Sequence, residues 1–515
     1  MKAGFRQSMS WLHTWAGLFF GWLLFAIFLT GTLSVFAHEI TDWMQPELRR
    51  VGSAPRAEAI ARAQATLERE APQSRLWQIA LPHAEDEPIE IRWRHGSTRE
   101  ARFLDPATGG IVPVRETEGG EFFVDFHYSL MSRPAGIWII AAVSIGMLAL
   151  LLSGIIIHKR IFRDFFTFRP GARAPHRAWL DAHNVCGVLA LPFHLMITYT
   201  GLAIMFSVTM PVGVQLHYGG SLARLRADVV TPFERPAARQ PAPLLPLAPM
   251  VEQAEGILGP ETAELVTVYN PGDANAVVDV FRRTDDRIAA IADHAAFEGT
   301  TGRHVGTQVA WNPSAYVWRA MVGLHLAQFG GAAMRWLYFL SGLAGSAMIA
   351  TGLVMFTVKR MARHGAASRF DRAVARINVA AVAGVVIACI AYLWLNRLLP
   401  AGMAGRAGWE MGLLLPVWLA TLLHAALRPP AQGWREQFGL AALLCLALPL
   451  LDLATGGRPF AAGLAALGPV EAVDLTAFGC GLGLARLAWY LARQRAAPAP
   501  RAPLARPAAL PGQAR

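Results

Sequence analysis

The sequence contains one unit twice, and each copy carries histidines at matching positions. A glycine follows His13 at four residues and a Thr-Gly pair follows at 17 and 18, and His183 is followed by the same residues at the same spacings. In a second pair of segments, a glycine follows both His127 and His325 at 27 residues, and Lys-Arg comes soon after. Such repetition indicates two copies of one structural unit. The matched residues are Gly17, Thr30, Gly31 and Gly154 in the first copy and Gly187, Thr200, Gly201 and Gly352 in the second.

The composition places this unit in a membrane. Of the 515 residues, 54% are hydrophobic and only 16% are charged, and the mean hydropathy is +0.34. Several apolar runs approach twenty residues, the length that an α-helix needs to cross a bilayer. We expect an α-helical membrane bundle of about eight spans, at residues 11–36, 136–158, 184–210, 335–358, 375–396, 410–427, 437–454 and 472–491.

The net charge of +11 is explained better by membrane topology than by nucleic-acid binding. Lys and Arg residues gather at span ends, before the first span and after the second and fourth. By the positive-inside rule, the N-terminus, the loops at 161–182 and 361–374 and the tail at 492–515 are cytoplasmic. The tail is rich in Pro, Ala and Arg, which predicts disorder. The first apolar stretch is too long for a removed signal peptide and is expected to stay as an anchor.

The four cysteines all fall inside apolar spans, and no CxxC pair occurs among them. This pattern excludes a disulfide framework, a zinc knuckle, an iron-sulfur cluster and covalent c-type haem attachment. We interpret them as core residues. They are Cys186, Cys389, Cys445 and Cys480.

Two long segments outside the spans, 39–130 and 211–330, lie on the non-cytoplasmic side in this topology. Each opens with a short Ala/Glu-rich helical stretch, at 57–70 and 247–258, and continues with short strands. The strands are expected at 76–81, 89–94 and 101–105 in the first and at 263–270, 276–283 and 288–293 in the second. Each ends in a glycine-containing turn, at 105–110 and 298–303. The order is thus helix (1–38), small α+β domain (39–130), helix (131–160), helix (183–210), α+β domain (211–330) and helix (331–360), followed by four helices (375–491).

The motifs of this repeat resemble a known family. LHTWAG and LTGTLSVF in the first span, DPATGGIV at the end of the first domain and DFHYSL before the second span occur in the order found in PepSY-associated transmembrane proteins, often called iron-regulated membrane proteins. The resemblance covers about residues 8 to 365. It implies a bacterial inner-membrane protein with two PepSY-like domains facing the periplasm. Some members resemble ferric-siderophore reductases that carry b-type haem between their helices. The four C-terminal spans depart from this pattern.

The repeated histidines are candidate haem ligands on their own chemistry. His13 and His183 lie at the cytoplasmic ends of spans one and three, and His127 and His325 lie at the periplasmic entrances to spans two and four. Two levels of paired histidine result. Imidazole is a common axial ligand of b-type haem, and helical bundles hold such cofactors between facing side chains. The alternatives are interfacial histidines for the first pair and polar residues tying the domains to the membrane for the second.

His194 is a further candidate ligand, and the remaining histidines are weaker ones. His194 follows His183 by 11 residues, which on a straight helix is nearly the same face and roughly 16 Å deeper, so one helix could serve two cofactors. The alternative for His194 is a hydrogen bond between helices, to Thr198 or Tyr199. His158 is a reserve ligand, because Phe356 takes its place in the second copy. We expect ordinary surface residues at the histidines of the soluble segments, which are His83, His95, His217, His294 and His304.

The motifs that are absent restrict the mechanism. The sequence has no dinucleotide-binding G-x-G-x-x-G after a strand, no Walker loop and no acidic relay cluster within the spans. We therefore expect a separate electron donor, either a quinol or a cytoplasmic reductase. The favoured function is electron transfer through two haem b groups, held by His13, His183, His194, His127, His325 and in reserve His158, to a periplasmic ferric siderophore or related chelate. Reduction releases iron because hard oxygen donors hold Fe(III) far better than Fe(II).

Two other functions remain open from the sequence. The soluble domains could form a binding or regulatory module for a peptide, a protease or a chelate, with the spans as an anchor. Alternatively, the bundle could be a permease that moves the chelate or iron, with the C-terminal spans as its distinguishing feature. The presence of a redox cofactor distinguishes electron transfer from these two functions, because neither a binding module nor a permease requires one.

Overall fold

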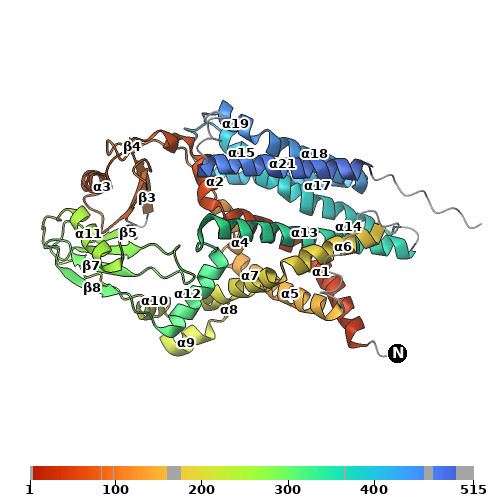
Figure 1. Ribbon diagram of the computed structural model, residues 1–515, viewed down its shortest axis with the longest axis horizontal. Helices are drawn as coiled ribbons and strands as arrows, with labels where there is room; N and C mark the ends of the chain where they lie inside the picture. Colours follow the sequence, from red (N-terminus) through yellow and green to blue (C-terminus); the bar gives the residue numbers. More distant parts are fainter. Residues whose placement is uncertain are drawn as a thin grey trace, which may run out of the picture.

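The structure is a computed structural model that describes residues 4–82, 84–96, 98–158, 175–364, 367–456 and 468–493. It divides into a helical region and a β-sheet region, with the N-terminal end of the chain at the end of the bundle farthest from the sheet (Figure 1). Most of the loop expected at 161–182 and nearly all of the tail expected at 492–515 lie outside the described residues, as does His83.

Seven described helical segments are long and apolar enough to cross a membrane, or up to eight if a bent pair counts as one span. The chain is thus a multi-pass membrane protein, as its composition predicts. The single-helix spans are α1 (Phe5–Ser34), α5 (Ala135–Ile157), α13 (Gly331–His364) and α21 (Pro469–Arg493). The composite spans are α14 (Arg369–Val379) with η2 (Ala380–Gly384) and α15 (Val385–Leu398), α16 (Arg406–Gly412) with α17 (Leu414–Leu427), and α18 (Pro430–Leu446) with α19 (Leu448–Ala454).

The third span differs from the straight helix expected at 184–210. It consists of α6 (Pro175–Leu189) and α7 (Leu191–Ile204), which meet at 64°. Pro192 lies in the first turn of α7, where it lacks the N–H that a continuous helix would use and its ring opposes continuation of the preceding turn. The depth of 16 Å calculated for His194 is therefore wrong, because it assumed one straight axis.

The two soluble segments form one sheet rather than two separate ones. Its eight antiparallel strands run in the order β4-β3-β2-β1-β5-β6-β7-β8, and β1 joins the halves by pairing with β5, with Ile79 opposite Val266. The first half contains β1 (Leu76–Ala80), β2 (Ile89–His95), β3 (Thr98–Leu104) and β4 (Ile111–Val112), and the second contains β5 (Ala263–Tyr269), β6 (Val277–Arg282), β7 (His294–Glu298) and β8 (His304–Gln308). The strand expected at 288–293 is wrong, because these residues form a bend and an irregular segment before β7 begins.

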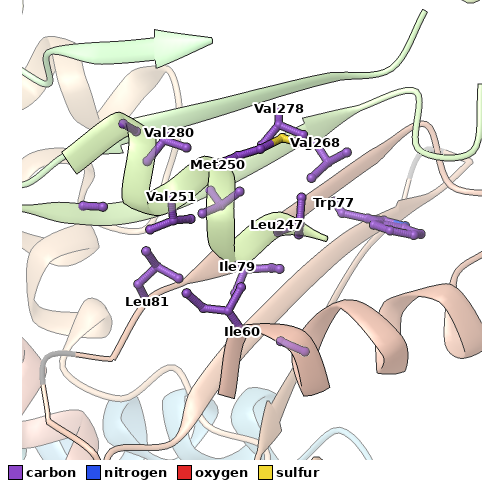
Figure 2. Packing of buried hydrophobic residues seen from close by; sticks show 14 of the residues in the cluster. Ile60, Trp77, Ile79, Leu81, Leu247, Met250, Val251, Val268, Val278 and Val280 are labelled. Atoms are coloured by element: carbon purple, nitrogen blue, oxygen red, sulfur yellow. The ribbon is translucent and has the colours of Figure 1, made fainter. Parts of the chain in front are cut away.

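A shared hydrophobic core explains why the two halves join. Helices α3 (Arg56–Glu70) and α11 (Leu247–Leu258) contribute to one cluster with the inward-facing residues of both half-sheets (Figure 2). Alternation along the strands puts Trp77 and Ile79 of β1 in this core together with Val268 of β5. Neither half-sheet could bury these side chains alone, so the internal repeat is completed by pairing of its two copies.

Short helices connect the sheet to the spans. In the first copy these are α2 (Ala37–Met44), η1 (Pro46–Arg50) and α4 (Glu121–Ser129), and α4 leads into α5. In the second copy they are α8 (Phe206–Thr209), α9 (Val212–Tyr218), α10 (Leu222–Val229) and α12 (Pro313–Leu326), and α12 leads into α13. Helices α4 and α12 therefore occupy matching places and carry the matching residues His127 and His325.

One histidine of the sheet region is not the surface residue that the sequence suggested. His294 on β7 is fully buried, with its ring stacked on Phe281 at 4.8 Å between centroids. Its Nδ1 lies 2.8 Å from Asp279 Oδ1 and its Nε2 lies 3.0 Å from Gln308 Oε1. The same Gln308 oxygen accepts from the Thr231 N–H, and the amide nitrogen of Gln308 donates to the Val229 carbonyl. Both ring nitrogens of His294 thus face acceptors, which requires the doubly protonated imidazolium.

Candidate functional site

The first histidine pair joins the two copies within the helical region. His13 on α1 and His183 on α6 lie with ring centroids 6.2 Å apart and ring planes at 80°. Each Nδ1–H donates to a main-chain carbonyl of the neighbouring helix in its own copy, His13 to Leu150 at 3.0 Å and His183 to Met348 at 2.7 Å. This bond fixes the tautomer and leaves Nε2 as the free, basic nitrogen, which is the usual arrangement of a metal-ligating histidine.

The second pair lies at the sheet end of the helices and repeats the arrangement. His127 on α4 and His325 on α12 have ring centroids 6.0 Å apart, with planes at 31°. His127 Nδ1–H donates to the Ile27 carbonyl at 2.8 Å, and His325 Nδ1–H donates to Thr200 Oγ1 at 3.1 Å. That hydroxyl itself donates to the Met196 carbonyl, so it is free to accept. Nε2 is again the free nitrogen of both rings.

Four glycines of the repeat lie directly against these four rings, and we call them the glycine seats because a side chain at each would occupy the space of the ring. A Cβ placed on Gly154 would lie 3.3 Å from the His13 ring, and one on Gly352 would lie 3.1 Å from the His183 ring. At the other level, a Cβ on Gly31 would lie 2.6 Å from the His127 ring, and one on Gly201 would lie 2.8 Å from the His325 ring. The repeated glycines therefore leave room for the rings, at positions that match between the two copies.

A cavity of about 120 Å³ opens beside the first pair. A tetrapyrrole is larger than this volume, so its binding requires side chains along the cavity to turn aside. Three of these are methionines, which are unbranched and adapt to irregular shapes. The residues that line the cavity include His13, His183, Met147, Met348, Met355 and Leu353.

The donor set of each pair fits haem better than a metal held by protein alone. Each pair offers two imidazoles, and no group of three or more His, Cys, Asp or Glu side chains suited to a metal ion occurs among the described residues. Structural zinc needs four protein ligands and catalytic zinc three, whereas haem iron brings four ring nitrogens and needs only axial ligands. With a metal–imidazole bond of about 2.0 Å and roughly 1.1 Å from nitrogen to ring centre, two opposed axial imidazoles have centroids about 6 Å apart. Both observed separations match this value.

His194 belongs to neither pair. It is fully buried, and neither ring nitrogen has a hydrogen-bond partner, although the backbone of Gly187 and of Ser341 lies near the ring. Thr198, proposed from the sequence as a partner, instead donates from its hydroxyl to the His194 carbonyl. The ring lies among aromatic side chains, 6.0 Å from the ring of Phe28 and 5.8 Å from that of Phe193. It therefore stands apart from the two levels.

His158 also stands outside both pairs. It ends α5, and its backbone N–H donates to the Gly154 carbonyl. The residues that follow it, 159–174, lie outside the described part of the chain. The structure thus brings four of the six predicted site residues together, in the pairs His13–His183 and His127–His325.

Sequence reasoning missed a buried polar junction between the C-terminal helices and the first soluble segment. Arg397 on α15 pairs with Asp452 on α19, and Arg49 of η1 pairs with the same carboxylate at 3.0 Å. The Arg397 guanidinium lies 4.1 Å from the ring centre of Trp43, whose indole N–H donates to Asp474 at 2.9 Å. Charged residues near the ends of apolar runs were the available indication, because such groups are retained only where they are paired.

Comparisons with known proteins agree with the resemblance seen in the motifs. The family model described as "PepSY-associated TM region" matches residues 10–359. A relative from Pseudomonas aeruginosa, itself an uncharacterized protein, is 28% identical over 404 residues, which cover 74% of this chain and 96% of the relative. The C-terminal helices from α14 onward lie beyond the family match. The chain belongs to the family of PepSY-associated transmembrane proteins.

Proposed function

We propose that this protein is an inner-membrane electron-transfer protein that holds two haem b groups, one between His13 and His183 and one between His127 and His325. The observation that carries the proposal is the pair of neighbouring imidazoles at each level, one from each copy, with Nδ1 bound to main-chain or threonine oxygen and with centroids 6.2 and 6.0 Å apart. When bound, haem supplies one-electron redox chemistry at its iron. The protein holds the haem in a fixed orientation and excludes water around it.

The two levels suit transfer between the two sides of a membrane. In the proposed orientation, His13 and His183 lie toward the cytoplasm, where a quinol or a cytoplasmic reductase donates electrons one at a time. His127 and His325 lie toward the sheet, which faces the periplasm. There a ferric siderophore or related chelate accepts one electron and becomes the ferrous chelate, from which iron dissociates more readily. Each chelate takes one electron, so a quinol that is oxidised to the quinone reduces two chelates and releases two protons, and the reaction balances.

The four histidines are positioned to act as ligands with little rearrangement. The hydrogen bonds at Nδ1 hold each ring and raise the basicity of Nε2. The glycine seats admit each ring against its neighbouring helix.

The test of this function is haem content together with reduction of a ferric chelate. The protein purified in detergent from haem-sufficient cells should show a b-type spectrum, and after reduction it should be reoxidised by a ferric hydroxamate with formation of one ferrous ion per electron. Replacing His127 by alanine should slow this reoxidation more than replacing His217, which lies on α9 outside both pairs. A folded protein without haem would overturn the proposal.

A second function has one observation in its favour. The edge strand β4 and η1 line an open groove of about 550 Å³, and an exposed sheet edge can accept a peptide as an additional strand. A peptide-binding module would need no haem, so a colourless folded protein that binds extended peptides would favour this function.

A further inference from the structure

The C-terminal helices hold the segment that leads into α4, the helix that carries His127. Arg406 donates from Nη1 to the Glu116 carbonyl at 2.9 Å, and the Thr117 hydroxyl donates to Glu410 at 2.6 Å. The Tyr392 hydroxyl donates to the Gly119 carbonyl at 3.0 Å. Three C-terminal side chains thus bind residues 116–119, immediately before α4 begins.

Tyr392 also packs against α4 itself. Its side chain is fully buried, and its ring lies 4.5 Å from that of Phe122 and 5.6 Å from that of Phe123. Phe123 precedes His127 by four residues, so the two side chains lie on adjacent turns of one helix face. The contact with Tyr392 therefore lies one turn from the His127 ring.

Contacts with α1 and α2 also fix α4. Gly120 approaches α2 so closely that a Cβ there would lie 2.1 Å from the Ala37 carbonyl oxygen, and the Gly120 N–H donates to Thr41 at 2.9 Å. On α1, the Ile27 carbonyl accepts from His127. Helix α4 is thus held by α1, α2 and the C-terminal region together, and residues of α2 and α4 share one hydrophobic cluster with Tyr392.

The second copy holds its histidine helix differently. Asn312 caps α12 with its own side chain, and the Arg319 carbonyl accepts from the Ala290 N–H of the sheet region. Gly323 lies so close to the Ile288 carbonyl that a Cβ would meet its oxygen at 1.7 Å. These contacts come from the second soluble segment, whereas α4 has in addition contacts from α15 and α16 of the C-terminal region.

We propose that the C-terminal region is a positioning element for His127 and that Tyr392 is its principal positioning residue. This inference rests on the proposed function for its effect on haem, but its structural part, the fixing of α4, stands without it. Orientation and hydrogen bonding of an axial histidine set the potential of its haem. Tyr392 therefore tunes the His127–His325 site and leaves the His13–His183 site unchanged.

The experiment compares Tyr392→Phe with Trp418→Phe in the full-length protein. The first variant removes the hydroxyl that binds Gly119 and keeps the ring. The control removes an indole N–H that donates to the Ala380 carbonyl at 3.1 Å inside the C-terminal region, with no contact to α4. Hydrogen exchange is measured for peptides of α4 and α12, and redox titration follows each haem.

We expect Tyr392→Phe to lower amide protection in α4 about five-fold, the factor for one hydrogen bond of typical net strength, with α12 unchanged. The midpoint potential of one haem should shift, and it should be the haem that His127→Ala removes. Trp418→Phe should leave both midpoint potentials and the amide protection of α4 and α12 unchanged. Unchanged protection of α4 in Tyr392→Phe, or equal shifts of both haems, would overturn the inference. Absence of haem from the wild-type protein would instead overturn the proposed function, and the exchange measurement would still decide the structural part.

Discussion

His127 and His325 face each other with ring planes 31° apart, whereas the planes of His13 and His183 are 80° apart. The two pairs have nearly the same separation, and they differ in this angle and in one acceptor, because His325 donates to the Thr200 hydroxyl whereas the other three rings donate to main-chain carbonyls. The electronic structure of a low-spin ferric haem depends on the angle between its axial ligand planes. The two sites are therefore distinguishable in one protein.

Electron paramagnetic resonance should resolve two low-spin ferric signals. The nearly perpendicular planes of His13 and His183 favour the more anisotropic signal, with the larger highest g value, because they leave the iron d-orbitals closer in energy. We expect His183→Ala to remove that signal and His127→Ala to remove the other. A single signal that both substitutions weaken equally would contradict the assignment of ligands to separate pairs.

The glycine seats predict a graded response to an added methyl group. Gly31→Ala should displace the His127 ring, because the new Cβ would lie 2.6 Å from it, and haem at that site should be lost. Gly439→Ala on α18 is the control, where an added Cβ would meet nothing within 4 Å. Haem content per chain measures the outcome. Equal haem content in both variants would argue against the glycines as ring seats.

His194 should be replaceable by leucine. The matching position in the first copy is Leu24, which is also buried, and leucine removes two buried ring nitrogens that lack partners, each of which costs about 1–3 kcal/mol. We expect His194→Leu to keep both haems and to raise the melting temperature. Loss of one haem in this variant would instead identify His194 as a ligand, as the sequence first suggested.

The sequence alone was sufficient to predict the arrangement of the repeat but not the way its copies combine. The spacings from His13 to Gly31 and from His127 to Gly154 marked both histidine levels, because each of these stretches carries a histidine of one level and the glycine that lies against the ring of the other level. The pairing of β1 with β5 could not be predicted, since it depends on a core shared by α3 and α11. The bend at Ala190 was missed despite Pro192, and the contact of Tyr392 with Gly119 joins residues too distant in sequence for any local pattern to indicate.

The sheet region should lose stability as pH rises. Hydrogen bonding and charge attraction from Asp279 outweigh burial and raise the pKa of His294 above its usual 6.5. Because the folded pKa exceeds the unfolded one, this stabilisation is complete below pH 6.5 and disappears as pH rises through the folded pKa. Asp293 adds favourable charge, and Phe281 and Phe233 cover the ring.

This prediction is checked by limited trypsin digestion between pH 7 and pH 9 near Arg226 and Arg235, which flank the Val229–Thr231 segment bound by Gln308. Cleavage should increase with pH in the wild type more steeply than the activity of trypsin on an unfolded substrate. Asp279→Asn should be cleaved readily at every pH. A flat pH response in the wild type would contradict an imidazolium at His294.

The polar junction should tolerate loss of both charges better than loss of one. Asp452→Asn leaves the Arg397 guanidinium buried without its anion and should cost about 3–5 kcal/mol. Arg397→Met combined with Asp452→Leu should recover much of that loss. The control Asp125→Asn breaks an exposed pair with Arg133 and should cost no more than about 1 kcal/mol. Thermal unfolding in detergent measures the stability of all three variants. Equal destabilisation by Asp452→Asn and Asp125→Asn would contradict a buried ion pair between Arg397 and Asp452.

The most direct test of the central claim is the visible spectrum of the purified protein, oxidised and dithionite-reduced, with pyridine haemochrome quantitation. The account predicts a b-type spectrum with two haems per chain, falling to one in His183→Ala and to one in His127→Ala. A folded, colourless protein from haem-sufficient cells, or a haem content that neither substitution changes, would contradict it.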